Sequence, residues 1–207
     1  MVYAVQVYSA ASTKAFKKGR TEAVRCTSKE SVAFTNAFDD AATDPQALRE
    51  LLREAVTVHR ARGRESSSGY GVDRHLFSIY SLLSEETGTE AADEAMGLMY
   101  GDAWGKHQKS ILSTSNCSVF GPSIVCPGFG AVCDDGYGLG YCIQKGSIDI
   151  CITNYTGDPG TGGAGFGGVV QEVEEHSFDT DAIQFGEELS TALRQIRELV
   201  LSTSSSS

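Results

Sequence analysis

The chain has 207 residues and a formal net charge of −10, so it is long enough for one domain with a substantial core and repels nucleic acid overall. No apolar run reaches membrane-spanning length, and none of the six cysteines forms a C-x-x-C pair of the kind that binds zinc. With no signal peptide at the start, we expect a reducing compartment and cysteines that act as small buried apolar residues.

Positive charge is concentrated at the beginning of the chain. Residues 1–29 contain six basic side chains against the single acid Glu22, which makes this segment +5 and the remainder −15. Such a patch attracts an anionic ligand, for example a phosphate-bearing cofactor, or is an ordinary solvated surface, and the sequence leaves both interpretations open.

The first predicted elements are a strand and a helix. Residues Tyr3–Tyr8 alternate between apolar and polar side chains, which is typical of a strand. Thr27, followed three residues later by Glu30, has the form of a capping box. The pattern predicts a helix from this point to about Phe38.

Three more helices are expected before residue 109. Asp44 and Pro45 suit the N-cap and first position of a helix, and an apolar stripe continues to about Arg62. Further helices are predicted at about 70–86 and 91–104.

The pattern changes after Lys109 to short strands. They are expected at 110–113, 139–144 and 148–154. The glycine-rich segment 158–168 lacks the Lys-Ser/Thr ending of a phosphate-binding loop, so it is interpreted as a flexible connection. A closing helix is expected at 179–201, and the serine-rich tail 202–207 is expected to be disordered. Helices, then strands, then a helix predict one α+β domain over residues 1–201.

A hydroxyl cluster, Ser113-Thr114-Ser115, follows the apolar pair Ile111-Leu112. Because strand side chains alternate, Ser113 and Ser115 should share one face, with Thr114 on the other. Two hydroxyls on one face can bind a carboxylate or a developing oxyanion, but they cannot act as acid or base alone. The cluster therefore predicts a polar ligand and a base from elsewhere; taken alone it is also compatible with an ordinary surface tripeptide.

The cluster is one of several motifs that occur in a fixed order. They are Tyr8 with Ser12-Thr13, Phe16 and Gly19–Arg25, then Val72–Phe77, then Ile111–Ser115, then Gly128–Gly130 with Asp135–Gly138. In this order and spacing the set resembles the carboxy-terminal portion of the carnitine/choline acyltransferase family, from about Val2 to about Val200. The likeness is strongest to the mitochondrial palmitoyltransferase branch of the inner membrane.

The resemblance implies a chloramphenicol-acetyltransferase-like fold and transfer of an acyl group, of long-chain type, between coenzyme A and carnitine. It implies carnitine and acyl-coenzyme A as partners, no metal and a mitochondrial location, and allows peripheral membrane association through the rest of such an enzyme. Family members take the catalytic base, a histidine, from an amino-terminal portion. The four histidines here do not match that motif, so we expect the isolated chain to be inactive; they are His59, His75, His107 and His176.

The resemblance also assigns a carnitine site. Arg74 matches the arginine that recognises the carboxylate, and a permanent charge with forked donors suits that task. Tyr8 and Thr21 lie thirteen residues apart, as do two family hydroxyls that bind the same carboxylate, although Ala10 stands where relatives often have serine. Because choline has no carboxylate, Arg74 favours carnitine. A surface salt bridge of Arg74 with Asp73 or Glu85 is the alternative.

Five further residues receive roles from the same resemblance. Ser115 matches the catalytic serine that stabilises the oxyanion, and Ser113 matches a carnitine contact. Phe129 would face the trimethylammonium group or would be a core aromatic. Arg60 and Asn116 align with contacts to coenzyme A in some relatives.

The acyl pocket should lie near Pro127 and Gly128, where Gly128 leaves depth for a long chain and Pro127 departs from the usual glycine. Two alternatives to an acyltransferase remain open at this point. They are a non-catalytic module that binds carnitine or acyl-coenzyme A, and a structural fragment with no ligand.

Overall fold

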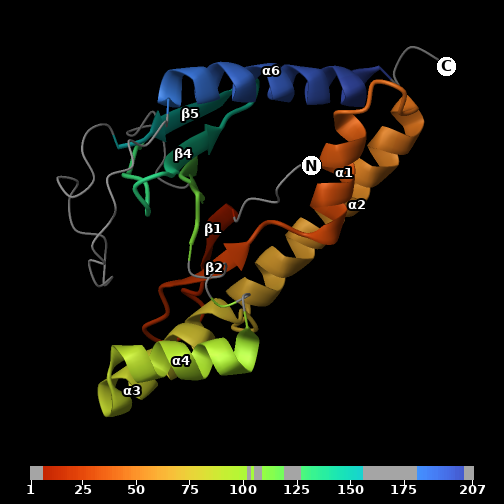
Figure 1. Ribbon diagram of the computed structural model, residues 1–207. Helices are drawn as coiled ribbons and strands as arrows, with labels where there is room; N and C mark the ends of the chain where they lie inside the picture. Colours follow the sequence, from red (N-terminus) through yellow and green to blue (C-terminus); the bar gives the residue numbers. More distant parts are fainter. Residues whose placement is uncertain (1–6, 102–103, 105–108, 119–126, 156–180, 203–207) are drawn as a thin grey trace.

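The computed structural model describes residues 7–101, 104, 109–118, 127–155 and 181–202. Figure 1 shows a mixed α/β arrangement, with α6 above the strands, α1 and α2 to their right, and α3 and α4 below. The strands are β1 (Val7–Ser12), β2 (Thr21–Arg25), β3 (Leu112–Asn116), β4 (Tyr137–Ile143) and β5 (Ile148–Thr153). The helices are α1 (Lys29–Phe38), α2 (Pro45–Ser67), α3 (Asp73–Thr87), α4 (Thr89–Tyr100) and α6 (Ala182–Leu201).

The sheet has the order β2-β1-β3-β4-β5, so the serine-bearing strand β3 is central. Strands β1, β3 and β4 run parallel, and the two edge strands β2 and β5 run antiparallel to their neighbours. Parallel neighbours require long connections, and α1 to α4 lie in the connection between β2 and β3.

Helices α2 and α6 pack along different parts of the sheet (Figure 1). Arg62 of α2 donates through Nη1 to the carbonyls of Arg25 (2.9 Å) and Thr27 (2.8 Å), at the end of β2. Phe185 of α6 stacks on Tyr137 of β4, with ring centroids 4.5 Å apart. Helices α3 and α4 lie at the opposite end of the molecule from α6.

The first helix begins one residue later than the capping pattern suggested. Ser28, not Thr27, is the N-cap, and its hydroxyl accepts from the backbone N–H of Ser31 (3.1 Å) while Ser31 Oγ accepts from the N–H of Ser28 (2.8 Å). Serine can therefore replace the expected Glu30 as the reciprocal partner in the box.

Helix α2 starts as expected, with Asp44 accepting from the amides of Gln46 and Ala47, but it continues to Ser67 rather than Arg62. Gly69, with φ of 83°, adopts a left-handed conformation in the turn after α2, and α3 starts at Asp73 instead of Tyr70.

The expected strands exist, with shifted bounds and one addition. β1 extends to Ser12, beyond the predicted end at Tyr8, and β3 begins at Leu112 and contains the whole hydroxyl cluster. β2 was not predicted as a strand because Thr21–Arg25 offers only five residues and includes two charged side chains. Those two side chains, Glu22 and Arg25, are used in contacts with α3.

Some predictions fall on residues outside the described part. They are residues 1–6, the glycine-rich segment 158–168, the first residues of the closing helix, and residues 203–207 of the tail. Ser202, the first residue of the predicted tail, is the C-cap of α6 and its hydroxyl accepts from Arg49 (3.0 Å).

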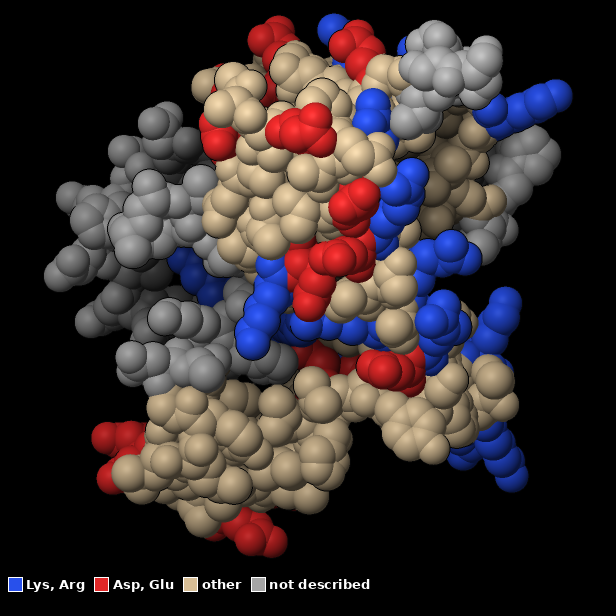
Figure 2. All heavy atoms as spheres, turned by 90° about the vertical axis from the view of Figure 1, so that its right-hand side faces the viewer, with Lys and Arg blue, Asp and Glu red and all other residues tan. Residues whose placement is uncertain are grey.

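The surface is uneven in character. Figure 2 shows basic and acidic side chains interleaved across the middle of one face, while the lower left of the view is mostly uncharged, with acidic side chains at its rim. Exposed apolar side chains on α3 and α4 include Phe77, Leu82, Leu98 and Met99. These two helices therefore present apolar surface to their surroundings.

Candidate functional site

The predicted site residues on β1 and β3 lie on one face of the sheet. Ser113 is paired with Tyr8 of β1 and with Gly138 of β4, and residues paired across a sheet project to the same side. Ser113 is 2% exposed, whereas Ser115, two residues further along the same face, is partly exposed. Thr114 projects to the opposite face, where its hydroxyl donates to the Tyr8 carbonyl (3.0 Å). The alternation expected for the hydroxyl cluster is therefore confirmed.

Two glycines on β4 lie beside the serines and make room on this face for a neighbouring segment of the chain. Gly138 and Gly140 pair with Ser113 and Ser115, and a Cβ at either position would collide with the carbonyl of Phe129 or Pro127, respectively. The segment 127–130 thus lies directly against β4, on the face that carries the serines. Thr153 fixes it further by donating to the Phe129 carbonyl.

Thr21 faces the same side as Tyr8, at the start of the edge strand β2. The Nε of Arg74, in the first turn of α3, donates to the Thr21 carbonyl (3.3 Å), and the Arg74 side chain is exposed. Strand spacing puts the Cα atoms of Thr21 and Ser115 roughly 12 Å apart across the sheet. The hydroxyls of Tyr8, Thr21, Ser113 and Ser115 therefore project from one face of the sheet, with the Arg74 guanidinium at its edge.

Arg74 does not form the salt bridge that was the alternative reading of its role. Asp73 instead pairs with Arg25 of β2, whose Nε and Nη2 lie 3.0 and 2.6 Å from Asp73 Oδ1. Arg25 Nη1 also donates to Ser110 Oγ (2.6 Å), three residues before Ser113. This network ties the start of α3 to the approach of β3, and sequence reasoning missed it.

A second set of polar contacts stabilises the turn that precedes β4. Lys109 Nζ lies 2.6 Å from Asp135 Oδ2, and the Tyr137 amide donates to the Ile111 carbonyl (2.8 Å). Cys133 Sγ donates to the Ser110 carbonyl (3.3 Å), and burial together with the nearby Asp135 carboxylate raises the pKa of this thiol to about 12. Cys133 is therefore a neutral structural thiol at physiological pH.

The two residues predicted to contact coenzyme A are not brought to the serine face. Asn116 follows Ser115 directly, so it projects to the other side of the sheet, where Oδ1 accepts from the Ser118 amide (3.0 Å). Arg60 is exposed on α2. Their contact with the cofactor stays a prediction.

The described residues supply no evident base for the serines. His59 and His75 are both exposed, on α2 and α3, and neither hydrogen-bonds to Ser113 or Ser115 within the described part of the chain. His107 and His176 lie outside it. The site as described can bind and polarise a ligand, but it lacks a group suited to remove a proton.

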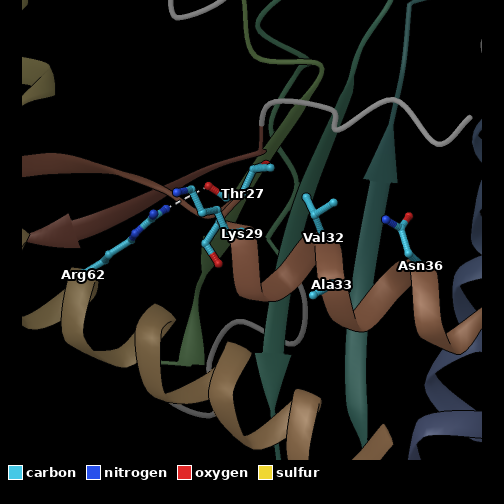
Figure 3. A pocket seen from close by; sticks show the side chains of 7 residues that line it. Thr27, Lys29, Val32, Ala33, Asn36 and Arg62 are labelled. Carbon is cyan, nitrogen blue, oxygen red and sulfur yellow. Dashed lines mark hydrogen bonds between the residues drawn. The ribbon is translucent and has the colours of Figure 1, made fainter.

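A separate pocket of about 560 Å³ lies beside the beginning of α1 (Figure 3). Its cationic residues are Lys29 and Arg62, and the Arg62 guanidinium is already directed at the Thr27 carbonyl. The lining contains none of the predicted site residues; it consists of Thr27, Ser28, Lys29, Val32, Ala33, Asn36 and Arg62.

The described residues contain no group of three or more His, Cys, Asp and Glu side chains that could hold a metal ion. Their five cysteines are all free thiols: Cys26, Cys117, Cys133, Cys142 and Cys151. Among the same residues, no helix combines the length and hydropathy needed to cross a membrane.

Sequence comparison identifies the class of protein. Residues 3–172 match the family model described as choline/carnitine O-acyltransferase, which covers more than half of the chain. The chain therefore belongs to the choline/carnitine O-acyltransferase family, and the expectation drawn from its motifs is confirmed.

Individual relatives are named for carnitine. The chain is 35% identical over 148 residues to the putative mitochondrial carnitine O-acetyltransferase of Saccharomyces cerevisiae, covering 72% of the chain and 21% of that relative. It is 31% identical over 178 residues to the human mitochondrial carnitine O-palmitoyltransferase 2, covering 84% of the chain and 25% of that relative. The chain thus spans about a quarter or less of the length of these relatives.

Proposed function

We propose that this chain is the carboxy-terminal portion of an enzyme that transfers an acyl group between coenzyme A and carnitine. The observation that carries the proposal is the common sheet face of Tyr8, Thr21, Ser113 and Ser115, with Arg74 at its edge. Family membership and relatives named as carnitine acyltransferases support the reaction class. We further propose that the mixed sheet is part of a chloramphenicol-acetyltransferase-like fold, and that the enzyme is mitochondrial like its named relatives.

Carnitine recognition rests on charge at the edge of the sheet. The exposed Arg74 guanidinium keeps donors available beyond its bond to Thr21, and it would bind the carnitine carboxylate with the hydroxyls of Thr21 and Tyr8. Phe129 lies in the segment that packs against β4 on the serine face, where an aromatic ring could attract the trimethylammonium group. Choline lacks the carboxylate, so Arg74 gives it no charged partner.

Ser115 would stabilise the oxyanion formed when the thioester carbonyl is attacked, while the more deeply buried Ser113 would contact carnitine. Acyl-coenzyme A is the co-substrate, with Arg60 and Asn116 as its proposed contacts in this chain. The general base would come from another part of the complete enzyme, because the described residues provide none at the serines.

We propose long-chain substrates because Gly128 has no side chain to shorten an acyl pocket. The space beside Gly128 is small, because a Cβ at this position would lie 2.7 Å from Cys151 Sγ. The Cys151 thiol of β5 therefore already fills the space beside Gly128, and an acyl chain entering there would have to displace it.

A ligand titration followed residue by residue tests the proposed site. The 207-residue chain, labelled with ¹⁵N, would be titrated with carnitine while amide chemical shifts are recorded. Shifts concentrated at Thr21, Arg74, Ser113 and Phe129 are expected. Shifts concentrated at Lys29, Val32 and Asn36 would assign the ligand to the pocket beside α1 and contradict the proposal.

A further inference from the structure

Glu22 is a buried carboxylate that the predicted chemistry does not use. It lies on β2 and is only 5% exposed. Its Oε1 accepts from its neighbour's amide, Ala23 N–H (2.8 Å), and from the amide of Arg74 (3.1 Å), which is distant in sequence. A buried carboxylate needs such donors, because burying an unpaired charge is costly.

The first turn of helix α3 also benefits from this contact, because its amides need a hydrogen-bond acceptor. Its N-cap residue, Val72, has no side chain that can accept a hydrogen bond from the first turn. Glu22 supplies this acceptor from another element, and its negative charge suits the positive end of a helix. Adjacent residues of β2 thus bind both the backbone and the side chain of Arg74. Glu22 accepts from its amide, and the Thr21 carbonyl accepts from its Nε.

The chain before α3 is shaped to admit the Glu22 side chain. A Cβ at Gly71 would overlap Glu22 Cγ and lie 2.6 Å from its Cδ and 2.9 Å from its Oε2. Any residue larger than glycine would therefore displace the carboxylate from the first turn of α3. Gly71 offers a way to disturb the contact without changing its charge.

We propose that Glu22 is a positioning residue for Arg74, acting by fixing the first turn of α3 so that the guanidinium stays at the edge of the sheet. The inference rests on the proposed function in one respect, namely that Arg74 receives the carnitine carboxylate. The Arg25–Asp73 pair holds the same turn through its neighbouring residue, so loss of Glu22 loosens the position of Arg74 without detaching α3.

The test compares Glu22→Leu, which removes the acceptor, with Glu22→Gln, which keeps an oxygen at its place. Hydrogen exchange at the Arg74 amide is measured in the 207-residue chain, together with calorimetric affinities for carnitine and for choline. In Glu22→Leu we expect exchange at Arg74 to accelerate about tenfold and carnitine affinity to fall about tenfold, with choline affinity unchanged. Glu22→Gln should stay within about threefold of the parent in both measurements.

Gly71→Ala is the second variant and should reproduce the Glu22→Leu result by displacing the carboxylate while residue 22 and its charge are kept. Gly63→Ala is its matched control, because a Cβ at Gly63 meets no atom within 4 Å. Unchanged Arg74 exchange in Glu22→Leu and Gly71→Ala would overturn the proposal, as would equal losses for carnitine and choline. If the parent chain shows no preference for carnitine over choline, the proposed function fails instead, while the exchange measurement still decides whether Glu22 holds the turn.

Discussion

Ser113 and Ser115 project from the same face of β3 but differ in exposure, which separates what each can contribute. Charge appears on the thioester oxygen only as the tetrahedral intermediate forms, so a donor aimed at it acts mainly in the transition state. A donor to carnitine acts in the ground state and the transition state alike. The partly exposed Ser115 suits the first task. Ser113, at 2% exposure, is proposed for the second task, and the groups that cover it must move before it contacts carnitine.

In an enzyme that carries the complete family domain, Ser115→Ala should lower kcat by about 10²–10³ with little change in KM. Ser113→Ala should mainly raise the KM for carnitine. Steady-state kinetics with palmitoyl-coenzyme A would measure both. If Ser115→Ala kept its turnover and both variants raised only the carnitine KM, the hydroxyl cluster would be a carnitine clamp and the oxyanion role would be wrong.

Cys133 provides a prediction about pH at the residue scale. Because burial and the Asp135 carboxylate raise its pKa to about 12, the thiol stays protonated at pH 8 and is a poor nucleophile there. Mass spectrometry after iodoacetamide treatment at pH 8 should find Cys133 unmodified in the folded chain and modified in denaturant. Asp135→Asn should speed the modification, and rapid labelling of the folded parent at pH 8 would contradict the account.

At the scale of elements, Gly138 and Gly140 let the segment 127–130 lie flat on β4. Gly140→Ala would force its Cβ into the Pro127 carbonyl, so we expect the free energy of unfolding to fall by about 1–3 kcal/mol. Urea denaturation measures this change. The control is Gly63→Ala, which lies inside α2 with open space and should stabilise by about 0.5–1 kcal/mol. Equal effects of the two substitutions would show that the segment does not pack as described.

The contact between β2 and α3 gives another prediction at this scale. Removing one partner of the Arg25–Asp73 pair leaves a largely desolvated charge, so Asp73→Ala should lower the free energy of unfolding by about 3 kcal/mol. The exposed ion pair of Lys109 and Asp135 is the comparison, and Lys109→Met should cost less than about 1 kcal/mol. Thermal denaturation of both variants would rank the two pairs.

These elements show which features could be predicted from the sequence. Local signals predicted α2 from Asp44 and Pro45 and the alternation of residues 113–115, because both depend on near neighbours. The strand β2 was missed because its charged residues, Glu22 and Arg25, find their partners in α3, about fifty residues away. The glycines of β4 are evident in the sequence. The packing of segment 127–130 against them is a tertiary contact, which the sequence pattern does not indicate.

At the scale of the whole molecule, the described residues place the predicted site residues along one sheet face and provide no evident base there. The motifs placed Tyr8, Thr21, Ser113 and Ser115 together through family resemblance, and the register of the sheet is consistent with that grouping. Asn116 and Arg60 were assigned to coenzyme A through relatives alone. Strand alternation puts Asn116 on the face opposite Ser115, and the position of Arg60 depends on which side of α2 is exposed.

We therefore predict that the purified 207-residue chain is catalytically silent. The assay follows carnitine-dependent release of coenzyme A from palmitoyl-coenzyme A, with a full-length relative as the positive control. Turnover comparable to that relative would contradict the absence of a base and would require a catalytic group within this chain.

The central claim is that this chain recognises the carnitine carboxylate through Arg74, and calorimetric titration of carnitine into the parent chain and Arg74→Asn tests it most directly. Removing the guanidinium leaves the carboxylate without a charged partner, so carnitine binding should weaken by about 2–4 kcal/mol. Choline binding should be unchanged or improved. Equal carnitine affinity of the two chains would contradict the account, because the carboxylate would then be bound without Arg74.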